Sequence, residues 1–284
     1  MRSPSFVALV TLVLAVGGAN GLVAQEATPQ NVAPVVGYTD TPFLPGGKWH
    51  VHDPMRPQPP VVTPSRNTTN VVPEAPPVDA EVLFDGSNIA KWQTGDGQTS
   101  GWIVQDGAMT VPPRGSAGGG DIVTKESFGD MQLHIEWRTP TTVKGNGQER
   151  GNSGILIMGR YELQVLDSFD NPTYPDGQAG AVYGQTPPLV NASRGPGQWQ
   201  SYDVFWTAPR FANGQLQTPA FISVLHNGIL VQNHTKLLGA TVHRQLASYS
   251  AHGAKEPLRL QDHGDAVQYR NIWVRPLENA EPDF

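Results

Sequence analysis

The regular interruption of the chain from Ala80 onward by Gly, Asn, Asp and Pro is the feature that most limits its fold. Between these residues lie short apolar or alternating runs, and no stretch keeps a 3.6-residue apolar period. The 284 residues include 31 Gly and 26 Pro, and both residue types break helices. The pattern predicts an all-β fold, an antiparallel β-sandwich with little helix.

The expected strands are the runs between these turn residues. They are Glu81–Phe84, Trp102–Gln105, Ala108–Val111, Asp121–Thr124, Met131–Arg138, Gly154–Met158, Tyr161–Leu166, Ser201–Trp206, Ala220–His226, Ile229–His234 and Tyr269–Arg275. Asn227-Gly228 and Asp106-Gly107 are typical of tight hairpin turns, because both dipeptides accept positive φ angles.

The N-terminus predicts a secretory signal over residues 1–24. Arg2 precedes the apolar run 6–16, and small residues lead up to Gln25. The apolar run is too short to cross ~30 Å of hydrocarbon, and no second run of that length follows. We therefore expect an exported protein, periplasmic or extracellular, with no transmembrane anchor.

Residues 25–78 are rich in proline, which favours extended chain over helix or inner strand. Because residues 37–57 also contain large apolar side chains, we expect them to form an ordered strap, with 61–78 mobile. His50 and His52 alternate around Val51, so they could face one ligand or be two solvated loop histidines. The sandwich domain is expected over residues 79–277, followed by a tail at 278–284.

Composition excludes several classes of site. Without Cys there is no disulfide, thiolate nucleophile or Cys-ligated metal. The net charge of −6 argues against a nucleic-acid partner. The glycine-rich run 115–120 lacks the Lys-Ser/Thr of a phosphate loop, so we interpret it as a flexible loop near the site. No nucleotide or redox cofactor is expected.

Two expected strands carry polar side chains on one face. In Met131–Arg138 the polar face includes Glu136, and in Tyr161–Leu166 it is formed by Glu162 and Gln164. A solvated outer face would explain either strand alone. The neighbouring segment 150–154 and Asp167 add Arg, Asn and carboxylate groups, which suit a polyhydroxylated ligand because each hydroxyl both donates and accepts.

Five blocks of sequence, in order, resemble the 3-keto-disaccharide hydrolase family. They are residues 83–93, 101–113, 118–140, 149–206 and 258–277. The resemblance implies a concanavalin A-like jelly-roll sandwich. It also implies a carbohydrate substrate, a glycoside whose glucose unit a separate sugar 3-dehydrogenase has oxidised at C3.

The resemblance also points to candidate site residues. The motif positions correspond to Glu136, Arg150, Asn152, Ser153, Glu162, Gln164, Asp167, Gln261, Asp262 and His263. A C3 ketone acidifies the C2 proton, so a base at C2 allows elimination of the C1 oxygen, and water then adds back. We expect a base, a stabiliser of the enolate oxygen and an acid for the leaving group.

His263 is the preferred base, because imidazole titrates near neutral pH; the alternative is a structural loop histidine. Arg150 is a candidate electrophile. Glu136 is a second acid or a partner of Arg150. The remaining polar residues, Asn152, Ser153, Gln164, Gln261 and Asp262, would bind substrate hydroxyls.

Glu162, Asp167 and His263 could together hold one divalent cation that polarises the C3 carbonyl. These ligands suit calcium, manganese or zinc about equally. A calcium ion that only shapes a loop, or a pair of carboxylates that only clamps a sugar, are the alternatives.

Two other functions compete with this interpretation. A retaining glucanase of this superfamily would carry Glu-x-Asp-x-Glu on one strand and needs two carboxyl groups ~5–5.5 Å apart. It is disfavoured, because Gln164 stands where the aspartate would be and no second glutamate follows. A non-catalytic carbohydrate-binding module is the stronger rival, with Tyr161, Tyr183 or Trp199 as stacking platforms. Clustered acid and base groups favour the enzyme.

Overall fold

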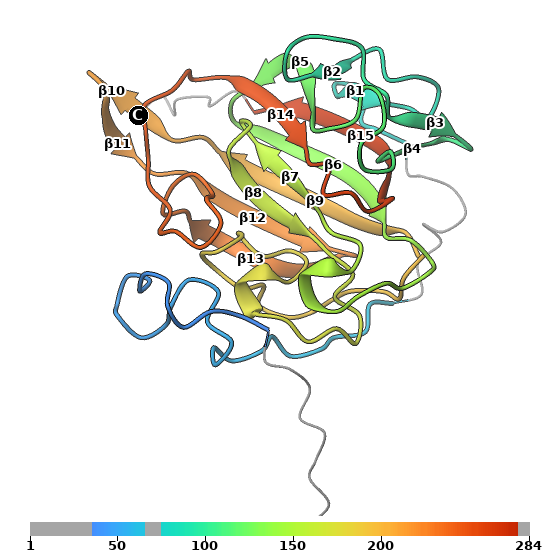
Figure 1. Ribbon diagram of the computed structural model, residues 1–284. Coiled ribbons are helices and arrows are strands. Elements are labelled where there is room, and N and C mark those ends of the chain that lie inside the picture. Colours follow the sequence, from blue (N-terminus) through green and yellow to red (C-terminus); the bar gives the residue numbers. More distant parts are fainter. Residues whose placement is uncertain (1–35, 66–74, 278–284) are drawn as a thin grey trace, which may run out of the picture. The chain divides into compact units, whose positions relative to one another are not determined.

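The computed structural model describes residues 36–65 and 75–277. The expected signal over 1–24 and the tail at 278–284 lie outside the described residues. Strands dominate, and the described helices are short 3-10 turns, including η2 (Gly147–Glu149) and η3 (Pro175–Gly177). The strands form two stacked sheets in which neighbouring strands are antiparallel, so the predicted β-sandwich is confirmed (Figure 1).

The larger sheet has the order β13-β12-β9-β6-β15-β4-β3, with β1 also paired to β15. Its strands are β13 (Ile229–Lys236), β12 (Phe221–His226), β9 (Gln200–Thr207), β6 (Met131–Arg138), β15 (Gln268–Pro276), β4 (Ala108–Thr110), β3 (Ile103–Gln105) and β1 (Glu81–Phe84).

The smaller sheet has five strands in the order β2-β5-β14-β7-β8. Their bounds are β2 (Trp92–Thr94), β5 (Ile122–Phe128), β14 (Glu256–Leu260), β7 (Ser153–Ile157) and β8 (Tyr161–Val165). A separate hairpin joins β10 (Arg210–Ala212) to β11 (Gln215–Thr218).

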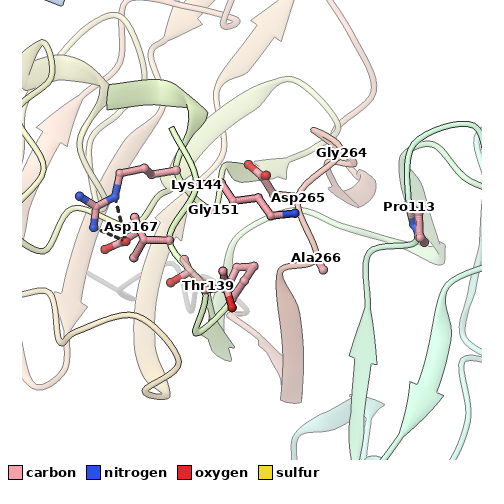
Figure 2. Close-up of a pocket in the computed structure, with 12 residues that line it drawn as sticks. Pro113, Thr139, Lys144, Gly151, Asp167, Gly264, Asp265 and Ala266 are labelled. Atoms are coloured by element: carbon pink, nitrogen blue, oxygen red, sulfur yellow. Dashed lines mark hydrogen bonds and ion pairs between the residues drawn. The ribbon is translucent and has the colours of Figure 1, made fainter. Parts of the chain in front are cut away.

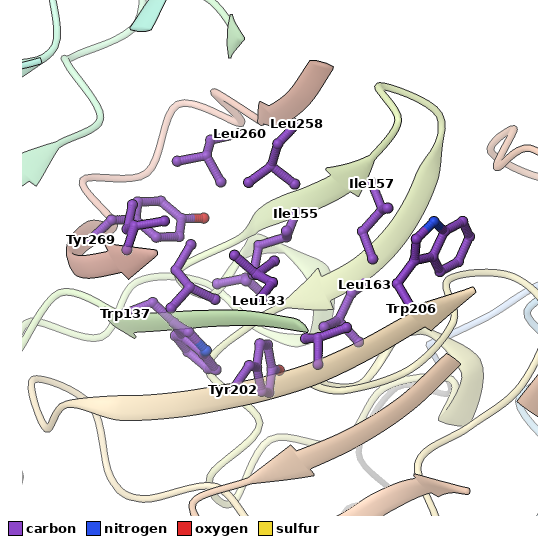
Figure 3. Close-up of a cluster of buried hydrophobic side chains, with 14 of the residues drawn as sticks. Leu133, Trp137, Ile155, Ile157, Leu163, Tyr202, Trp206, Leu258, Leu260 and Tyr269 are labelled. Atoms are coloured by element: carbon purple, nitrogen blue, oxygen red, sulfur yellow. The ribbon is translucent and has the colours of Figure 1, made fainter. Parts of the chain in front are cut away.

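The hydrophobic core lies between the two sheets (Figure 3). Leu133 and Trp137 of β6 enter it from the larger sheet, and Ile155 of β7 and Leu163 of β8 enter it from the smaller sheet. Because side chains alternate along a strand, the residues between them point away from the core. Each sheet therefore has an outer face, and the two outer faces lie on opposite sides of the sandwich.

The hairpin turns agree with the sequence. Asn227 and Gly228 both have positive φ, 54° and 80°, as do Asp106 and Gly107. Four strands were not expected: β2, β10, β11 and β14. The last is central to the smaller sheet but contains Pro257, which lies at an irregularity in its pairing with β5. A proline within an apolar run usually argues against an inner strand, because it cannot donate to the ladder. The sequence pattern therefore did not predict β14.

Residues 36–65, here called the strap, are ordered against the sandwich domain. Val61 forms a parallel bridge with Asn191, and Gln58 donates to the Thr173 carbonyl at 2.8 Å. Within the expected strap at 37–57, the His52 N–H donates to Asp176 Oδ2 at 3.0 Å, so its order is confirmed. The order extends to Val62, whose N–H donates to the Asn191 carbonyl, so the expected mobility was wrong at residues 61 and 62. Residues 66–74 lie outside the described residues.

Both interpretations of the strap histidines were wrong. His52 is fully buried, and its Nδ1 lies 3.2 Å from Asp176 Oδ1. His50 instead stacks on Phe43, with ring centroids 3.9 Å apart. The two histidines therefore have different surroundings and do not face one ligand.

Candidate active site

The outer face of the smaller sheet carries a row of polar side chains centred on Glu162. Tyr161 and Leu163 of β8 enter the core, so Glu162 points outward. It pairs with Leu156 of β7, and Leu156 pairs with Arg259 of β14. Residues paired across strands share a face, so Arg259 lies on this face two strands from Glu162.

An aromatic side chain lies on the other side of Glu162. Leu163 and Val182 form an antiparallel bridge, and the Tyr183 N–H donates to the Glu162 carbonyl at 3.1 Å. Val182 is buried in the core, so its neighbour Tyr183 points outward. Tyr183 and Glu162 are therefore adjacent on the outer face.

Glu162 is buried although it lies on an outer face. Its side chain is 7% exposed, and burial raises its pKa from 4.5 to about 8. The guanidinium of Arg259 opposes this shift, and the carboxylate of Asp121 adds to it. Near neutral pH the carboxyl is largely protonated and close to its titration point, as a group that donates and accepts protons requires.

Gly154 of the neighbouring strand β7 and Gln164 of β8 itself shape the position of this carboxyl. A Cβ on Gly154 would lie 2.7 Å from Glu162 Oε1, so only glycine leaves room for the carboxyl over β7. The Gln164 amide lies 3.2 Å from Glu162 Oε1. Because an amide presents either a donor or an acceptor on rotation, it can bond the ionised or the protonated carboxyl.

His263 lies on an exposed loop that Asp262 holds in place. Asp262 accepts the N–H groups of Gly120 and Gly264, both at 2.8 Å, and Arg114 donates to the His263 carbonyl at 2.7 Å. Asp262 was expected to bind substrate, but the structure uses both of its oxygens to fix the loop. The His263 side chain remains exposed, as a base requires.

His263 acts electrostatically on His243, which is a neighbour of Tyr183. Burial lowers the pKa of His243, and the charges of His52, Arg244 and His263 lower it further. Tyr183 is hydrogen-bonded to His243, with its hydroxyl 3.1 Å from Nδ1. Glu162 is therefore a neighbour of the Tyr183–His243 pair, and His263 affects the same pair through its charge.

Arg150 and Asp167 form a nearly buried ion pair at the edge of a cavity of about 520 Å³ (Figure 2). Arg150 Nη2 and Nε lie 2.5 and 3.1 Å from Asp167 Oδ2. The cavity is lined by residues of 139–144, 150–151 and 264–266, with Pro113 and Asp167. The loop that carries His263 therefore borders both this cavity and the Glu162 face.

The expected metal ligands are not assembled. Within residues 36–65 and 75–277, no group of three or more His, Asp or Glu side chains is arranged to hold a metal ion. Asp167 is bonded to Arg150, while Glu162 lies on the sheet face with a raised pKa. The residues present do not fit a cation shared by Glu162, Asp167 and His263, and we derive no step through one.

Three expected substrate-binding residues have other partners. Ser153 is fully buried: its hydroxyl donates to the Gln261 carbonyl at 2.6 Å and accepts from Tyr269 at 2.7 Å. The Gln261 N–H donates to the Gly154 carbonyl, which continues β14 beside β7. Asn152 Nδ2 donates to the Gln148 carbonyl at 2.7 Å. Ser153 is therefore part of the core and cannot contact a substrate.

Glu136 belongs to the opposite face. It points outward from β6 of the larger sheet and accepts from Arg270 at 2.7 Å and Asn271 at 3.0 Å. Burial acts to raise its pKa, but His134, Asn271 and Arg270 outweigh it and lower that pKa. The expected partnership with Arg150 was wrong, because the two residues have separate ion-pair partners.

The three expected stacking platforms also have different surroundings. Tyr161 is 1% exposed and packs against Trp206 in the core, so it is no platform. Trp199 lies on the other sheet's face, with the guanidinium of Arg270 4.2 Å from its ring centre. Tyr183 alone borders Glu162.

Sequence reasoning missed several site neighbours. Arg259 lies in a strand that Pro257 obscured, although it belongs to the last resembling block. Asp176 and His52 are 124 positions apart, and no local pattern links them. His243 lies in an irregular segment without periodicity.

The fold and the site together define a β-sandwich with a buried carboxyl of raised pKa on the outer face of its smaller sheet. Residues 79–275 match the family model described as a 3-keto-alpha-glucoside-1,2-lyase-like domain. The chain therefore belongs to this family, as its sequence blocks predicted. In the described residues no helix is long and apolar enough to span a membrane.

Similar proteins are described as hydrolases of carbohydrates. A 3-keto-disaccharide hydrolase of Bacteroides thetaiotaomicron is 25% identical over 248 residues, which cover 71% of this chain and 81% of the relative. A crystal structure of a candidate glycosyl hydrolase from Parabacteroides distasonis is 44% identical, with a TM-score of 0.70, over 78% of this chain and 93% of that one. A second structure from that organism, at 20% identity and TM-score 0.50, covers 70% and 94% and shares the fold. These likenesses support a glycoside hydrolase.

Proposed function

We propose that this protein cleaves 3-keto-glycosides by elimination and hydration. One observation supports this most strongly: the buried carboxyl of Glu162, with a pKa of about 8, lies on the same sheet face as the guanidinium of Arg259. Family membership and the 3-keto-disaccharide hydrolase relative favour the same substrate class.

The chemistry needs no oxidant or reductant once the ketone is present. A base removes the C2 proton, and the electron pair forms the C3 enolate. The enolate then expels the C1 oxygen, which takes a proton, and a C1–C2 double bond remains. Water adds its hydroxyl at C1 and returns a proton to C2. The products are a 3-keto sugar and the free leaving group, the same as those of hydrolysis.

Each step has a residue suited to it. His263 is the base, since its exposed imidazole nitrogen can accept a proton from substrate. Protonated Glu162 donates to the leaving oxygen, and its ionised form then activates water. Arg259, on the same face, stabilises the enolate oxygen. Gln164 positions the Glu162 carboxyl through its amide.

Export and substrate supply are part of the proposal. Residues 1–24 favour export to the periplasm or beyond the cell. The substrate must come from an oxidoreductase that converts a glycoside's C3 hydroxyl into a ketone, because the cleavage itself transfers no electrons.

The test compares a 3-keto-glucoside with its unoxidised parent, with products identified by mass spectrometry. We expect only the keto compound to be cleaved, and Glu162→Gln to abolish most of this activity. In deuterium oxide, the sugar product should gain deuterium at C2, which direct hydrolysis would not cause. Binding of sugar without cleavage of either compound would contradict the proposal and favour a carbohydrate-binding module.

A further inference from the structure

The strap lies outside the matched family domain but reaches the surroundings of Glu162. Strap residue His52 is fully buried beneath the aromatic residues that border the site. Its ring centre lies 4.3 Å from Tyr174, 4.7 Å from Tyr183 and 5.4 Å from His243. Since Tyr183 is adjacent to Glu162, His52 supports the neighbouring part of the site from below.

A buried carboxylate fixes His52. Asp176, which is fully buried in η3, accepts the His52 N–H at 3.0 Å through Oδ2, and its Oδ1 lies 3.2 Å from Nδ1. Arg56, also in the strap, lies 3.7 Å from Asp176 Oδ2. Buried charges require such partners, so this attachment is specific. In Figure 1 the blue strap runs past η3.

A second attachment holds the strap against His243 and Arg244. The Tyr38 ring lies 5.7 Å from that of His243, and the Arg244 guanidinium lies 4.2 Å from the Tyr38 ring centre. Arg244 also pairs with Asp40 at 2.7 Å. Tyr38 is half-buried and His243 is exposed, so both rings are accessible from solvent.

Hydrogen bonds orient the rings. The hydroxyls of Tyr174 and Tyr183 lie 2.7 Å apart, and Tyr183 reaches His243 Nδ1 at 3.1 Å. We call Tyr38, His52, Tyr174, Tyr183 and His243 the aromatic wall. Its five members come from three segments that lie far apart in the sequence. The strap supplies two members, Tyr38 and His52.

We propose that the accessible rings of the aromatic wall, Tyr38, Tyr183 and His243, bind the leaving-group sugar of the substrate, and that the strap thereby determines specificity. The buried rings of His52 and Tyr174 hold these three in place. This inference rests on the proposed function. With the C3 ketone toward Arg259 and the scissile oxygen at Glu162, the leaving group extends toward Tyr183, on the opposite side of Glu162 from Arg259. The C–H faces of a pyranose stack on aromatic rings, and the ring hydroxyls and imidazole bond its hydroxyls.

The test uses two 3-keto-glucosides, one with a sugar leaving group and one with a methyl leaving group. In the full-length protein, we expect Tyr38→Ala to lower kcat/KM about tenfold for the disaccharide, mainly through KM, which corresponds to about 1.4 kcal/mol. The methyl compound should be unaffected. Tyr38→Phe keeps the ring but loses the hydroxyl, so its loss of kcat/KM for the disaccharide should be smaller than that of Tyr38→Ala.

Phe43→Ala is the matched control, because Phe43 is another strap aromatic and is 52% exposed. Phe43→Ala should leave kcat/KM unchanged for both substrates. Equal losses on both substrates, or no loss on either, would overturn the role of the wall while the proposed function stands. A wild-type protein that cleaves neither compound would overturn the proposed function, and this inference with it.

Discussion

Glu162 extends over Gly154 of the neighbouring strand, at a place where any Cβ would lie 2.7 Å from its carboxyl oxygen. Although it has no side chain, Gly154 therefore shapes the proposed acid–base site. It allows the carboxyl to lie flat and buried on the sheet, and that burial is the main cause of the raised pKa.

The first prediction concerns Gly154→Ala. The added methyl group should displace the Glu162 carboxyl toward solvent, lower its pKa and reduce kcat at least tenfold. The pH–rate profile should move to lower pH, because a less buried carboxyl ionises more easily. Gly195→Ala is the control, since a Cβ there meets nothing within 4 Å. An unchanged pH profile in Gly154→Ala would contradict this account of the site.

The second prediction is a pH dependence of stability. The folded pKa of Glu162, about 8, exceeds its ordinary value of 4.5, so between these values the folded chain keeps a proton that the unfolded chain has released. Its contribution to stability therefore falls as pH rises from about 4.5 to 8. Glutamine does not titrate, so Glu162→Gln does not lose this stability. The Tm of the variant minus the Tm of wild type should therefore increase from pH 5 to pH 8.

Glu136→Gln serves as the comparison for this measurement. The pKa of Glu136 is lowered, so its stabilising contribution is present above about pH 4.5 and is lost as pH falls through the lower folded value. The Tm of Glu136→Gln relative to wild type should therefore not rise between pH 5 and pH 8. If the Tm difference rises equally in both variants, the raised pKa of Glu162 is not the cause of the pH dependence.

The third prediction separates His263 from the loop that carries it. Because the loop is held by Asp262, His263→Ala should reduce activity more than tenfold and leave Tm nearly unchanged. Asp262→Ala should lower both activity and Tm, because two backbone N–H groups lose their acceptor. His234→Ala, on β13, is the control for loss of an exposed histidine. A loss below tenfold in His263→Ala would remove His263 from the chemistry.

The fourth prediction concerns the ion pair of Arg150 and Asp167. Replacing either partner alone leaves a charge that is nearly buried, so Asp167→Ala should cost about 3 kcal/mol of unfolding free energy. The double variant Arg150→Ala/Asp167→Ala should cost less than the sum of the two single variants. Denaturant unfolding measures all four proteins, and additive losses would show that the pair is not coupled.

The sequence determined much of the fold because its signals are local. Alternation within Met131–Arg138 and Tyr161–Val165 assigned each side chain to a core or outer face, and two dipeptides located hairpin turns. The polar face of Glu162 and Gln164 was found in this way. Pro257 hid β14 because local rules treat proline as incompatible with an inner strand.

The tertiary structure decided which polar faces belong together. Alternation shows that Glu136 and Glu162 both point away from a core, but not that they belong to different sheets. Strand pairing brought Arg259 and Tyr183 to either side of Glu162, and folding joined His52 to Asp176 across 124 positions. Periodicity acts through neighbouring residues, whereas pairing and burial depend on segments that only the folded chain brings into contact.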